Sequence, residues 1–571
     1  FDTSIIRCVD DIPDSISFEC GREYPENYVG ISICESGITI GNDEVYSFDD
    51  INNLILRFWQ DGQVIDIQQL VGKNDYKKVE LPVYCFEKNS FWQDQIRTSV
   101  SDDIIIDEKY MELTPVWSMI QNDSAVVTKV LPENIIIFAD SNEEELLNIV
   151  GQHYKNSNIS LLSIRALREQ AECVGEGLEK LKYHDKIFFV VTDRDTSVNY
   201  NYEDWKNAFE NSAGSLHVLI KLMSDRGISS SEIDIKCLTF GNLCLENEKA
   251  IPMDSSIYGL CKSISREFHN WTISVCDLAS SWSDGEFSSE KFCESIKEFI
   301  ELSAQLKYGS ENIIRNGKIY AKELRPAEAK PSQPLFKKNG TYAIVGGTGG
   351  VGFLTAVHLA EKYSANVVLI GRSQFTKRQE ELLEKLRTFN TDPMYISANI
   401  CSRESLETAL ENIIEKYGHI NGIIHSALDL NDKLLINTNY EEFSSGTDTK
   451  IIGSINLCEI FGSAVSDFIL FYSSIESYSS FAGQGSITGC CFQDNYSEYL
   501  NRNSSMEVRT INWGYWGETG IAHAQGLEEK FKLLGLLPVS NKEGIEALER
   551  FISSGHQSLL SFRGEKKLLN M

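Results

Sequence analysis

The spacing of hydrophobic and polar positions changes along this chain. Apolar residues recur at helical spacing over residues 49–59, and a proline-containing aromatic stretch follows at residues 81–92. The first pattern predicts an amphipathic helix. The second favours an extended strap on the surface of another domain, with the core edge of a small domain as the alternative. Residues 1–108 are therefore expected to form a small α/β linker domain that ends in a strap.

Short apolar runs alternate with helical patterns over the next two hundred or so residues. The runs at residues 134–138, 187–191, 233–238 and 272–275 have the length of strands. Such alternation predicts a parallel sheet with helices on both faces. The turn after the first of these strands, residues 139–143, has acidic groups and no glycine, so a pyrophosphate could not approach its backbone. This half is predicted to bind no dinucleotide.

A second α/β pattern begins after a proline-punctuated stretch. Pro326, Pro331 and Pro334 lie in a segment rich in alanine, lysine and serine, which is typical of an extended linker. We therefore place one doubly wound domain at residues 109–330 and a second at residues 331–571. The fold class predicted is α/β, with two tandem doubly wound parallel sheets of which the first is truncated.

A glycine-rich turn opens the second domain. An apolar strand at residues 341–345 runs directly into the turn, and a helical pattern follows over residues 353–361. This strand–turn–helix context is the one in which G-x-G-x-x-G binds a dinucleotide, because glycines admit the pyrophosphate and the helix N-terminus supplies oriented N–H groups. The predicted cofactor-binding residues of this turn are Gly346, Gly347, Thr348, Gly349, Gly350, Val351 and Gly352.

The second strand of this domain, residues 366–370, ends in Gly371, Arg372 and Ser373. An acidic residue at this place binds the ribose hydroxyls of NAD, whereas an arginine suits the 2′-phosphate of NADPH. Arg372 and Ser373 therefore predict NADPH. A solvated surface arginine is the alternative interpretation of Arg372.

Composition narrows the class of protein. The 571 residues carry a formal charge of -30, with 42% hydrophobic and 24% charged residues. Such a negative charge repels nucleic acids and anionic membranes, so neither is an expected partner. The sequence contains no apolar run long enough for a membrane span, and its 14 cysteines show no C-x-x-C spacing of the metal-binding kind. We expect a cytoplasmic protein with reduced thiols and no metal site.

Several motifs together resemble the ketoreductase domains of modular polyketide synthases, which are short-chain dehydrogenase/reductase relatives. The upstream half is similar to the structural subdomain of that family, a truncated Rossmann fold without cofactor, and residues 81–92 look like the strap that ends the linker after its condensing and acyltransferase region. The motifs of the second half are residues 345–352, 371–372, 422–425, 468–474, 483–484 and 511–514.

The resemblance implies an activity and a set of catalytic residues. In this family, NADPH reduces the β-ketone of an acyl chain carried on the phosphopantetheine arm of an acyl carrier protein. A tyrosine protonates the alkoxide, a serine hydrogen-bonds it, and a lysine with an asparagine organises the proton relay. The serine falls on Ser474 and the lysine on Lys450. The tyrosine position, thirteen residues after the serine, holds Ile487, and the asparagine position holds Cys491.

The chain departs from the family at other positions too. Tyr478 and Tyr496 lie too far from position 487 to replace the missing phenol, and we interpret them as core or surface aromatics. Leu428 stands where the family usually has glycine, near the expected ribose. Asn399, followed by Ile400, stands where an aspartate commonly binds the adenine amino group. These two sites are expected to contribute to the cofactor cleft and to weaken NADPH binding.

Our hypothesis is a ketoreductase-like region of a polyketide synthase that keeps its fold but does not reduce. It would serve as a structural and docking element beside neighbouring synthase domains and the acyl carrier protein. Whether the chain is an enzyme stays open, because one rival is a working NADPH-dependent reductase of a β-keto or α-keto thioester with another proton donor. A second rival is an NADPH-dependent sensor or binding protein.

Overall fold

The computed structural model divides the chain into two compact units, residues 1–104 and residues 105–571. It describes residues 109–120, 131–245, 248–306, 309–328, 330, 332–429, 433–479, 485–520, 523 and 528–564, together with four short strands of the first unit. The helix predicted at residues 49–59 and the strap predicted at residues 81–92 lie outside the described residues.

The strands described in the first unit form one antiparallel sheet in the order β1-β2-β3-β4. Their bounds are β1 Ser15–Ile16, β2 Ile31–Cys34, β3 Gly37–Ile40 and β4 Glu44–Tyr46.

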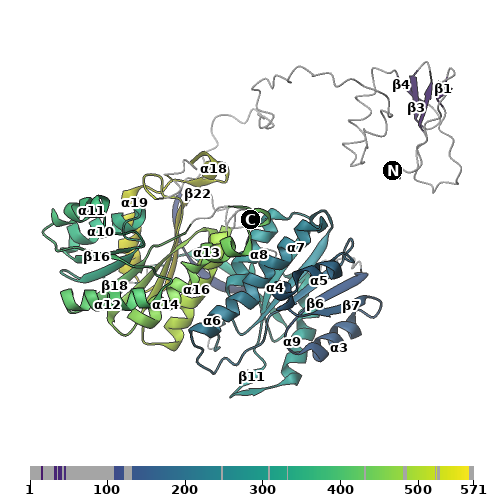
Figure 1. The fold of residues 1–571 in the computed structure, drawn as a ribbon, viewed down its shortest axis with the longest axis horizontal. Helices are drawn as coiled ribbons and strands as arrows, with labels where there is room; N and C mark the ends of the chain where they lie inside the picture. Colours follow the sequence, from purple (N-terminus) through teal and green to yellow (C-terminus); the bar gives the residue numbers. More distant parts are fainter. Residues whose placement is uncertain are drawn as a thin grey trace. The chain divides into compact units, whose positions relative to one another are not determined.

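The second unit begins with a half in which strands and helices alternate as the sequence predicts (Figure 1). The four predicted strands correspond to β6, β8, β9 and β10. The main elements of this half are β5 Lys109–Met119, β6 Asn134–Phe138, α3 Glu143–His153, β7 Asn158–Leu162, α4 Ala166–Glu169, α5 Ala171–Leu178, β8 Lys186–Val190, α6 Tyr202–Phe209, α7 Ser215–Asp225, β9 Ile233–Phe240, α8 Ser256–Glu267, β10 Trp271–Leu278, α9 Ser289–Leu302, β13 Glu311–Arg315 and β14 Lys318–Pro326.

The half that follows repeats the alternation, and its first strand is the one that feeds the glycine-rich turn. Its main elements are β15 Thr341–Val345, α10 Gly350–Tyr363, β16 Asn366–Gly371, α11 Lys377–Arg387, β17 Met394–Ser397, α12 Arg403–Tyr417, β18 Ile420–His425, α13 Tyr440–Asp448, α14 Ile451–Phe461, β19 Val465–Ser474, α15 Glu476–Ser479, α16 Gly485–Asn503, β20 Val508–Trp513, α18 Glu528–Leu533, β21 Leu536–Leu537, α19 Asn541–Ile552 and β22 Ser558–Gly564.

The two predicted sheets join edge to edge into one mostly parallel 16-stranded sheet. Fifteen of the strands follow the order β17-β16-β15-β18-β19-β20-β22-β5-β14-β13-β10-β9-β8-β6-β7, and β21 pairs with β22 off this path. The joint is made by β5, which pairs antiparallel with β22 on one side and with β14 on the other. No local pattern in the sequence predicts this joint, because the paired strands lie more than two hundred residues apart.

Helices cover both faces of the sheet, as the doubly wound pattern predicts (Figure 1). One face carries a continuous apolar core that runs through both halves and takes in helices α4 to α8 as well as α12, α14 and α16. On the opposite face, α3 and α9 cover the first half, while α10, α11 and α19 cover the second. The core thus fixes α8 and α16, which belong to different halves, on the same side of the sheet.

None of the described helices is both long and apolar enough to pass through a membrane.

Candidate cofactor cleft and active site

The glycine-rich turn adopts the tight geometry that its sequence predicts. Gly346 follows β15 with a φ of 79°, a conformation that favours glycine. A Cβ at Gly346 would lie 2.7 Å from the main-chain nitrogen of Ala427, and one at Gly352 would lie 2.6 Å from the carbonyl oxygen of Gly346. The turn therefore packs against the segment after β18 so closely that side chains at these two positions are excluded. Helix α10 begins directly after it, at Gly350.

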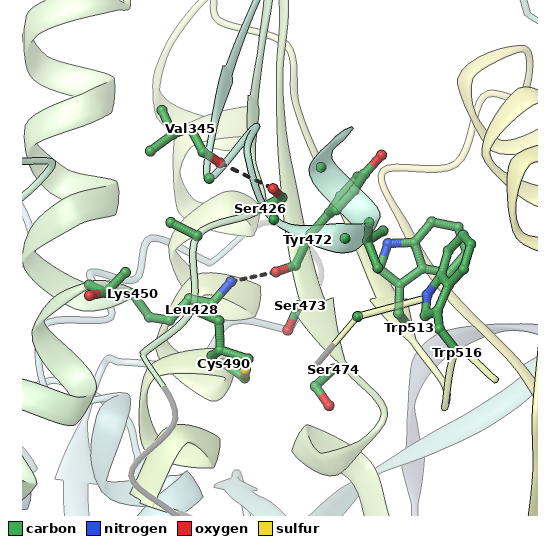
Figure 2. Close-up of a pocket in the computed structure, with 18 of the residues that line it drawn as sticks. Val345, Ser426, Leu428, Lys450, Tyr472, Ser473, Ser474, Cys490, Trp513 and Trp516 are labelled. Atoms are coloured by element: carbon green, nitrogen blue, oxygen red, sulfur yellow. Dashed lines mark hydrogen bonds between the residues drawn. The ribbon is translucent and has the colours of Figure 1, made fainter. Parts of the chain in front are cut away.

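A cavity of about 440 Å³ opens beside this turn, at the carboxyl ends of the parallel strands (Figure 2). Ligands of open parallel α/β sheets bind in this crevice. The residues that line the cavity come from the ends of six strands and the segments after them: Val345, Gly346, Thr348, Gly349, Gly350, Val351, Gly352, Gly371, Arg372, Ser373, Ala398, Ile400, Ser426, Ala427, Leu428, Thr449, Lys450, Tyr472, Ser473, Ser474, Ile475, Glu476, Cys490, Trp513, Gly514, Tyr515, Trp516, Thr519, Gly520, Phe531 and Leu536.

Most of the cofactor residues predicted from the sequence are among these lining residues. Arg372, Ser373, Ile400 and Leu428 join the glycine turn in the wall. Two predicted residues are not among them. Gly347 packs inward, where a Cβ would lie 2.8 Å from the carbonyl oxygen of Ile344. Asn399 uses its side-chain oxygen to accept a hydrogen bond of 3.1 Å from the main-chain N–H of Cys401.

The predicted lysine is buried and already engaged. The Lys450 ammonium donates a hydrogen bond to the main-chain carbonyl of Tyr472 (Figure 2). The side chain is 2% exposed. Burial holds the pKa of Lys450 below its usual value, although the neighbouring Cys490 and Asp494 act in the opposite direction. The cation therefore lies beside the cavity, where a relay lysine is expected.

The end of β19 brings a second polar group to the same wall. Ser473 and Ser474 both line the cavity. The Ser474 hydroxyl accepts a hydrogen bond of 3.2 Å from the main-chain N–H of Glu476. Asn512, on the neighbouring strand β20, donates one of 3.0 Å to the Ser473 hydroxyl. The Asn512 amide also donates to the carboxylate of Asp494, at 2.9 Å. The structure thus brings the two predicted catalytic residues, Lys450 and Ser474, to one cavity.

Helix α16 presents a different residue to this cavity from those expected. Ile487 is fully buried and its carbonyl oxygen lies 2.6 Å from the position that a Cβ of Gly259 would occupy on α8. The Cys491 thiol lies 3.7 Å from the Lys262 ammonium, also on α8. Neither Ile487 nor Cys491 is among the described lining residues, whereas Cys490 is. The backbone of Ile487 and the side chain of Cys491 therefore belong to the contact between α16 and α8.

Cys490 is the residue that the sequence analysis missed. Its side chain is 2% exposed, and it lies near Lys450 and the end of β19 (Figure 2). Burial, followed by the charge of Asp494, raises the pKa of this thiol to about 12, although Lys450 acts to lower it. Counting from family positions gave 487 and 491. Only the rotation of the helix, which packing sets, turns Cys490 toward the cavity.

The two tyrosines that were considered as substitutes lie elsewhere. Tyr496 is buried in an aromatic cluster, with its ring 5.3 Å from that of Phe492 and 5.2 Å from that of Trp205. Tyr478 lines a different cavity, between β5 and α16. Two tyrosines do line the cofactor cavity in its described part, Tyr472 and Tyr515. The Tyr472 hydroxyl shares a hydrogen bond of 2.8 Å with that of Thr355.

Comparisons with known proteins identify the second half. The KR domain family matches residues 340–518. Polyketide synthase PksN of Bacillus subtilis (strain 168) is 26% identical over 458 residues, which are 79% of this chain and 8% of that protein. The highly reducing polyketide synthase ACRTS2 of Alternaria alternata is 32% identical over 181 residues, or 31% of this chain and 7% of that protein. The chain thus spans less than a tenth of the length of these curated relatives.

Solved structures share the fold of both halves. A ketoreductase domain from the bacillaene assembly line is similar with a TM-score of 0.62 and 22% identity, covering 81% of this chain and 99% of that one. A multidomain structure with adenylation, ketoreductase and pseudo Asub parts, from a keto acid-selecting NRPS module, gives a TM-score of 0.69 at 18% identity and covers 81% of this chain and 40% of that one.

Domains of the KR family depend in general on NADH or NADPH. The glycine turn and the lining residues above provide the narrow backbone cradle that such a dinucleotide needs. Family match, relatives and fold agree, and this chain therefore contains a ketoreductase (KR) region of the modular polyketide synthase type.

Proposed function

We propose that this KR region binds NADPH but does not reduce the β-ketone of a carrier-bound acyl chain. In this proposal it acts as a structural and docking element between neighbouring synthase domains. The phosphopantetheine-bound chain of the acyl carrier protein then passes on unreduced. The single observation that carries the proposal is that a thiol, and not a phenol, faces the cavity from α16 near Lys450.

The side chains that remain support cofactor binding. Gly349 and Gly350 line the cavity where α10 begins, which is the place expected for a pyrophosphate. Arg372 with Ser373 provides hydrogen-bond donors where the 2′-phosphate of NADPH is expected. When bound, the cofactor would supply a hydride to a carbonyl carbon near Ser474. Ser474 lines the cavity, and in this proposal its hydroxyl holds the carbonyl oxygen.

Proton delivery is the step for which the chain lacks a suitable group. A hydride acceptor becomes an alkoxide, which needs a positioned acid, and losing that acid typically costs about 10²- to 10⁴-fold in rate. The Cys490 thiol, with its pKa of about 12, is a weaker acid than an ordinary tyrosine. The Lys450 ammonium donates to the Tyr472 carbonyl. Neither group reproduces a phenol held between the lysine and the serine.

One observation favours a rival function, a working reductase with another proton donor. Tyr515 lines the same cavity as Ser474, and its ring stacks on that of Phe531 at 4.9 Å. A phenol in this wall could serve a β-keto or α-keto thioester, of which the α-keto compound is the more electrophilic. In this rival hypothesis Tyr515 is the proton donor, and the protein loses its reductase activity when the Tyr515 hydroxyl is removed.

The test combines binding with turnover. NADPH is titrated into the whole chain in a calorimeter, and its oxidation is then followed with β-ketoacyl and α-ketoacyl thioester surrogates. We expect heat of binding and no oxidation above that of the Ser474→Ala variant. Steady NADPH oxidation by the parent chain, together with its loss in the Tyr515→Phe variant, would establish the rival function of a working reductase. Absence of NADPH binding would contradict the cofactor part of the proposal.

Restoring the family residues by sequence position offers a separate check. Ile487→Tyr with Cys491→Asn places the new side chains against α8, where Gly259 and Lys262 already lie in contact with the helix. We expect this double variant to remain inactive and to unfold at a lower temperature. A gain of NADPH oxidation would show that helix α16 presents residues 487 and 491 to the cavity, contrary to the placement described above.

A further inference from the structure

Two charged side chains meet across the mouth of the cofactor cleft. Arg372 follows β16 and Asp429 follows β18, and the strand between them is β15, which ends in the glycine turn. Two strand spacings separate β16 from β18, or about 10 Å. The Arg372 guanidinium and the Asp429 carboxylate bridge this gap with an ion pair of 2.8 Å. The pair therefore lies beside the cleft, at the switch point where the chain reverses its strand order.

The ion pair is accessible to a ligand. The Arg372 side chain is 66% exposed and that of Asp429 is 36% exposed. Pairs exposed to this degree contribute little stability, because water and salt screen them. Arg372 also lines the cavity. A phosphate arriving there can thus exchange with the carboxylate as partner of the guanidinium.

We propose that Asp429 is a specificity-determining residue that competes with the 2′-phosphate of NADPH for Arg372. The inference rests on the cofactor cleft of the proposed function. NADH carries no 2′-phosphate and leaves the ion pair intact. NADPH has to displace the carboxylate, and its phosphate then lies near a like charge that stays attached to the same wall. Arg372 raises the affinity for NADPH relative to NADH, and Asp429 therefore lowers this ratio.

The size of the effect follows from simple electrostatics. A unit charge about 5 Å from a phosphate of nearly two charges, in water, corresponds to roughly tenfold in affinity. Removing the carboxylate charge should strengthen NADPH binding by about this factor and change NADH binding by less than about twofold. Because the groups are exposed, the gain in NADPH affinity should decrease as the salt concentration is raised. Salt screens exposed charges over the Debye length, which is about 8 Å at physiological ionic strength.

The experiment measures the dissociation constants of NADPH and NADH by calorimetry for the whole chain, for three single variants and for the double variant Arg372→Gln with Asp429→Asn. Asp429→Asn removes the competing charge and keeps the size of the side chain. Arg372→Gln removes the phosphate partner. Glu380→Gln is the matched control, since Glu380 forms an exposed ion pair of 2.6 Å with Arg387 on α11, and it alters net charge by the same amount as Asp429→Asn.

The outcomes separate the inference from the proposed function. We expect Asp429→Asn to raise the NADPH-over-NADH preference about tenfold, and to raise it by a smaller factor in the Arg372→Gln background, where only the repulsion between Asp429 and the phosphate is removed. Unchanged preference in Asp429→Asn, with both cofactors binding the parent chain, would overturn the inference alone. A gain of equal size in Glu380→Gln would also overturn it, because net charge would then explain the effect. If neither cofactor binds the parent chain, the cofactor cleft and the inference fail together.

Discussion

Cys490 and Cys491 are adjacent residues of the same type, and the fold gives them different neighbours. Cys490 faces the cofactor cavity near Lys450, whereas Cys491 faces Lys262 of α8. Burial is the largest cause that raises the pKa of both thiols to about 12. The Cys490 thiol in the cavity wall therefore keeps its proton and is a poor acid.

The state of Cys490 can be measured with an alkylating reagent. Iodoacetamide reacts with the thiolate, so at pH 8 we expect the buried Cys490 to react at least about a hundredfold more slowly than the exposed Cys173. Peptide mass spectrometry of the native chain and of the chain in urea would measure both rates. Equal native rates at the two cysteines would show that Cys490 is neither buried nor suppressed as an acid.

At the scale of elements, the contact between α8 and α16 decides which side chains reach the cavity. Gly259 allows the two backbones to approach, because a Cβ at this position would lie 2.6 Å from the Ile487 carbonyl oxygen. The contact joins a helix of the first half to the helix that carries Cys490. Its close approach therefore sets the rotation of α16 about its own axis.

We predict that Gly259→Ala lowers the free energy of unfolding by about 1–3 kcal/mol, because backbone has to shift to admit a methyl group. Gly177→Ala, in α5, is the control. Its Cβ would lie 3.8 Å from a Leu162 methyl carbon, an ordinary contact, and alanine is the better helix former by about 0.5–1 kcal/mol. Urea unfolding should thus move in opposite directions for the two variants. A neutral Gly259→Ala would contradict the close packing of these helices.

At the scale of the whole second unit, a buried ionic cluster of the first half makes contact with the second half. Glu311 of β13 pairs with Lys262 of α8 at 2.9 Å and with Lys322 of β14. The Lys262 ammonium also donates to the carbonyl of Ser477 in the second half, at 2.5 Å. Burial alone would raise the pKa of Glu311, but Lys262 and then Lys322 outweigh it and lower that pKa from 4.5 to about 2.

Glu311→Gln leaves two buried ammonium groups without their anion, which should cost about 3–5 kcal/mol of unfolding free energy. The pH dependence has a definite sign. A carboxyl whose pKa is lower in the folded state stabilises the protein above its unfolded pKa. The contribution of Glu311 is therefore present above pH 4.5 and is lost as the pH falls toward 2.

Urea unfolding between pH 7 and pH 3 would measure both effects. The Glu323→Gln variant is the control, since Glu323 forms an exposed pair with Arg325 on the same strand as Lys322. We expect that control to change stability by less than about 0.5 kcal/mol. If Glu311→Gln behaved like Glu323→Gln at every pH, the buried cluster would not contribute to the stability of the fold.

Local patterns in the sequence located several strands of the second unit and the glycine turn. Apolar runs located β6, β9 and β15 because a strand that is buried on both faces is apolar along most of its length, and such a run can be read locally. Gly346 and Gly352 indicate a tight turn from the sequence alone, because a residue without Cβ at a strand–helix turn allows the backbone to approach its neighbours closely. The pairing of β5 with both β14 and β22 had no such local signal.

What the sequence determined by itself was therefore the α/β class, the glycine turn and the residue types available near it. The tertiary structure decided which of those residues meet. The rotation of α16 depends on contacts with α8, more than two hundred residues away, and this rotation turns Cys490 to the cavity and Ile487 away from it. The pairing of Arg372 with Asp429 likewise depends on strand order, because only the sheet places β16 and β18 on either side of β15.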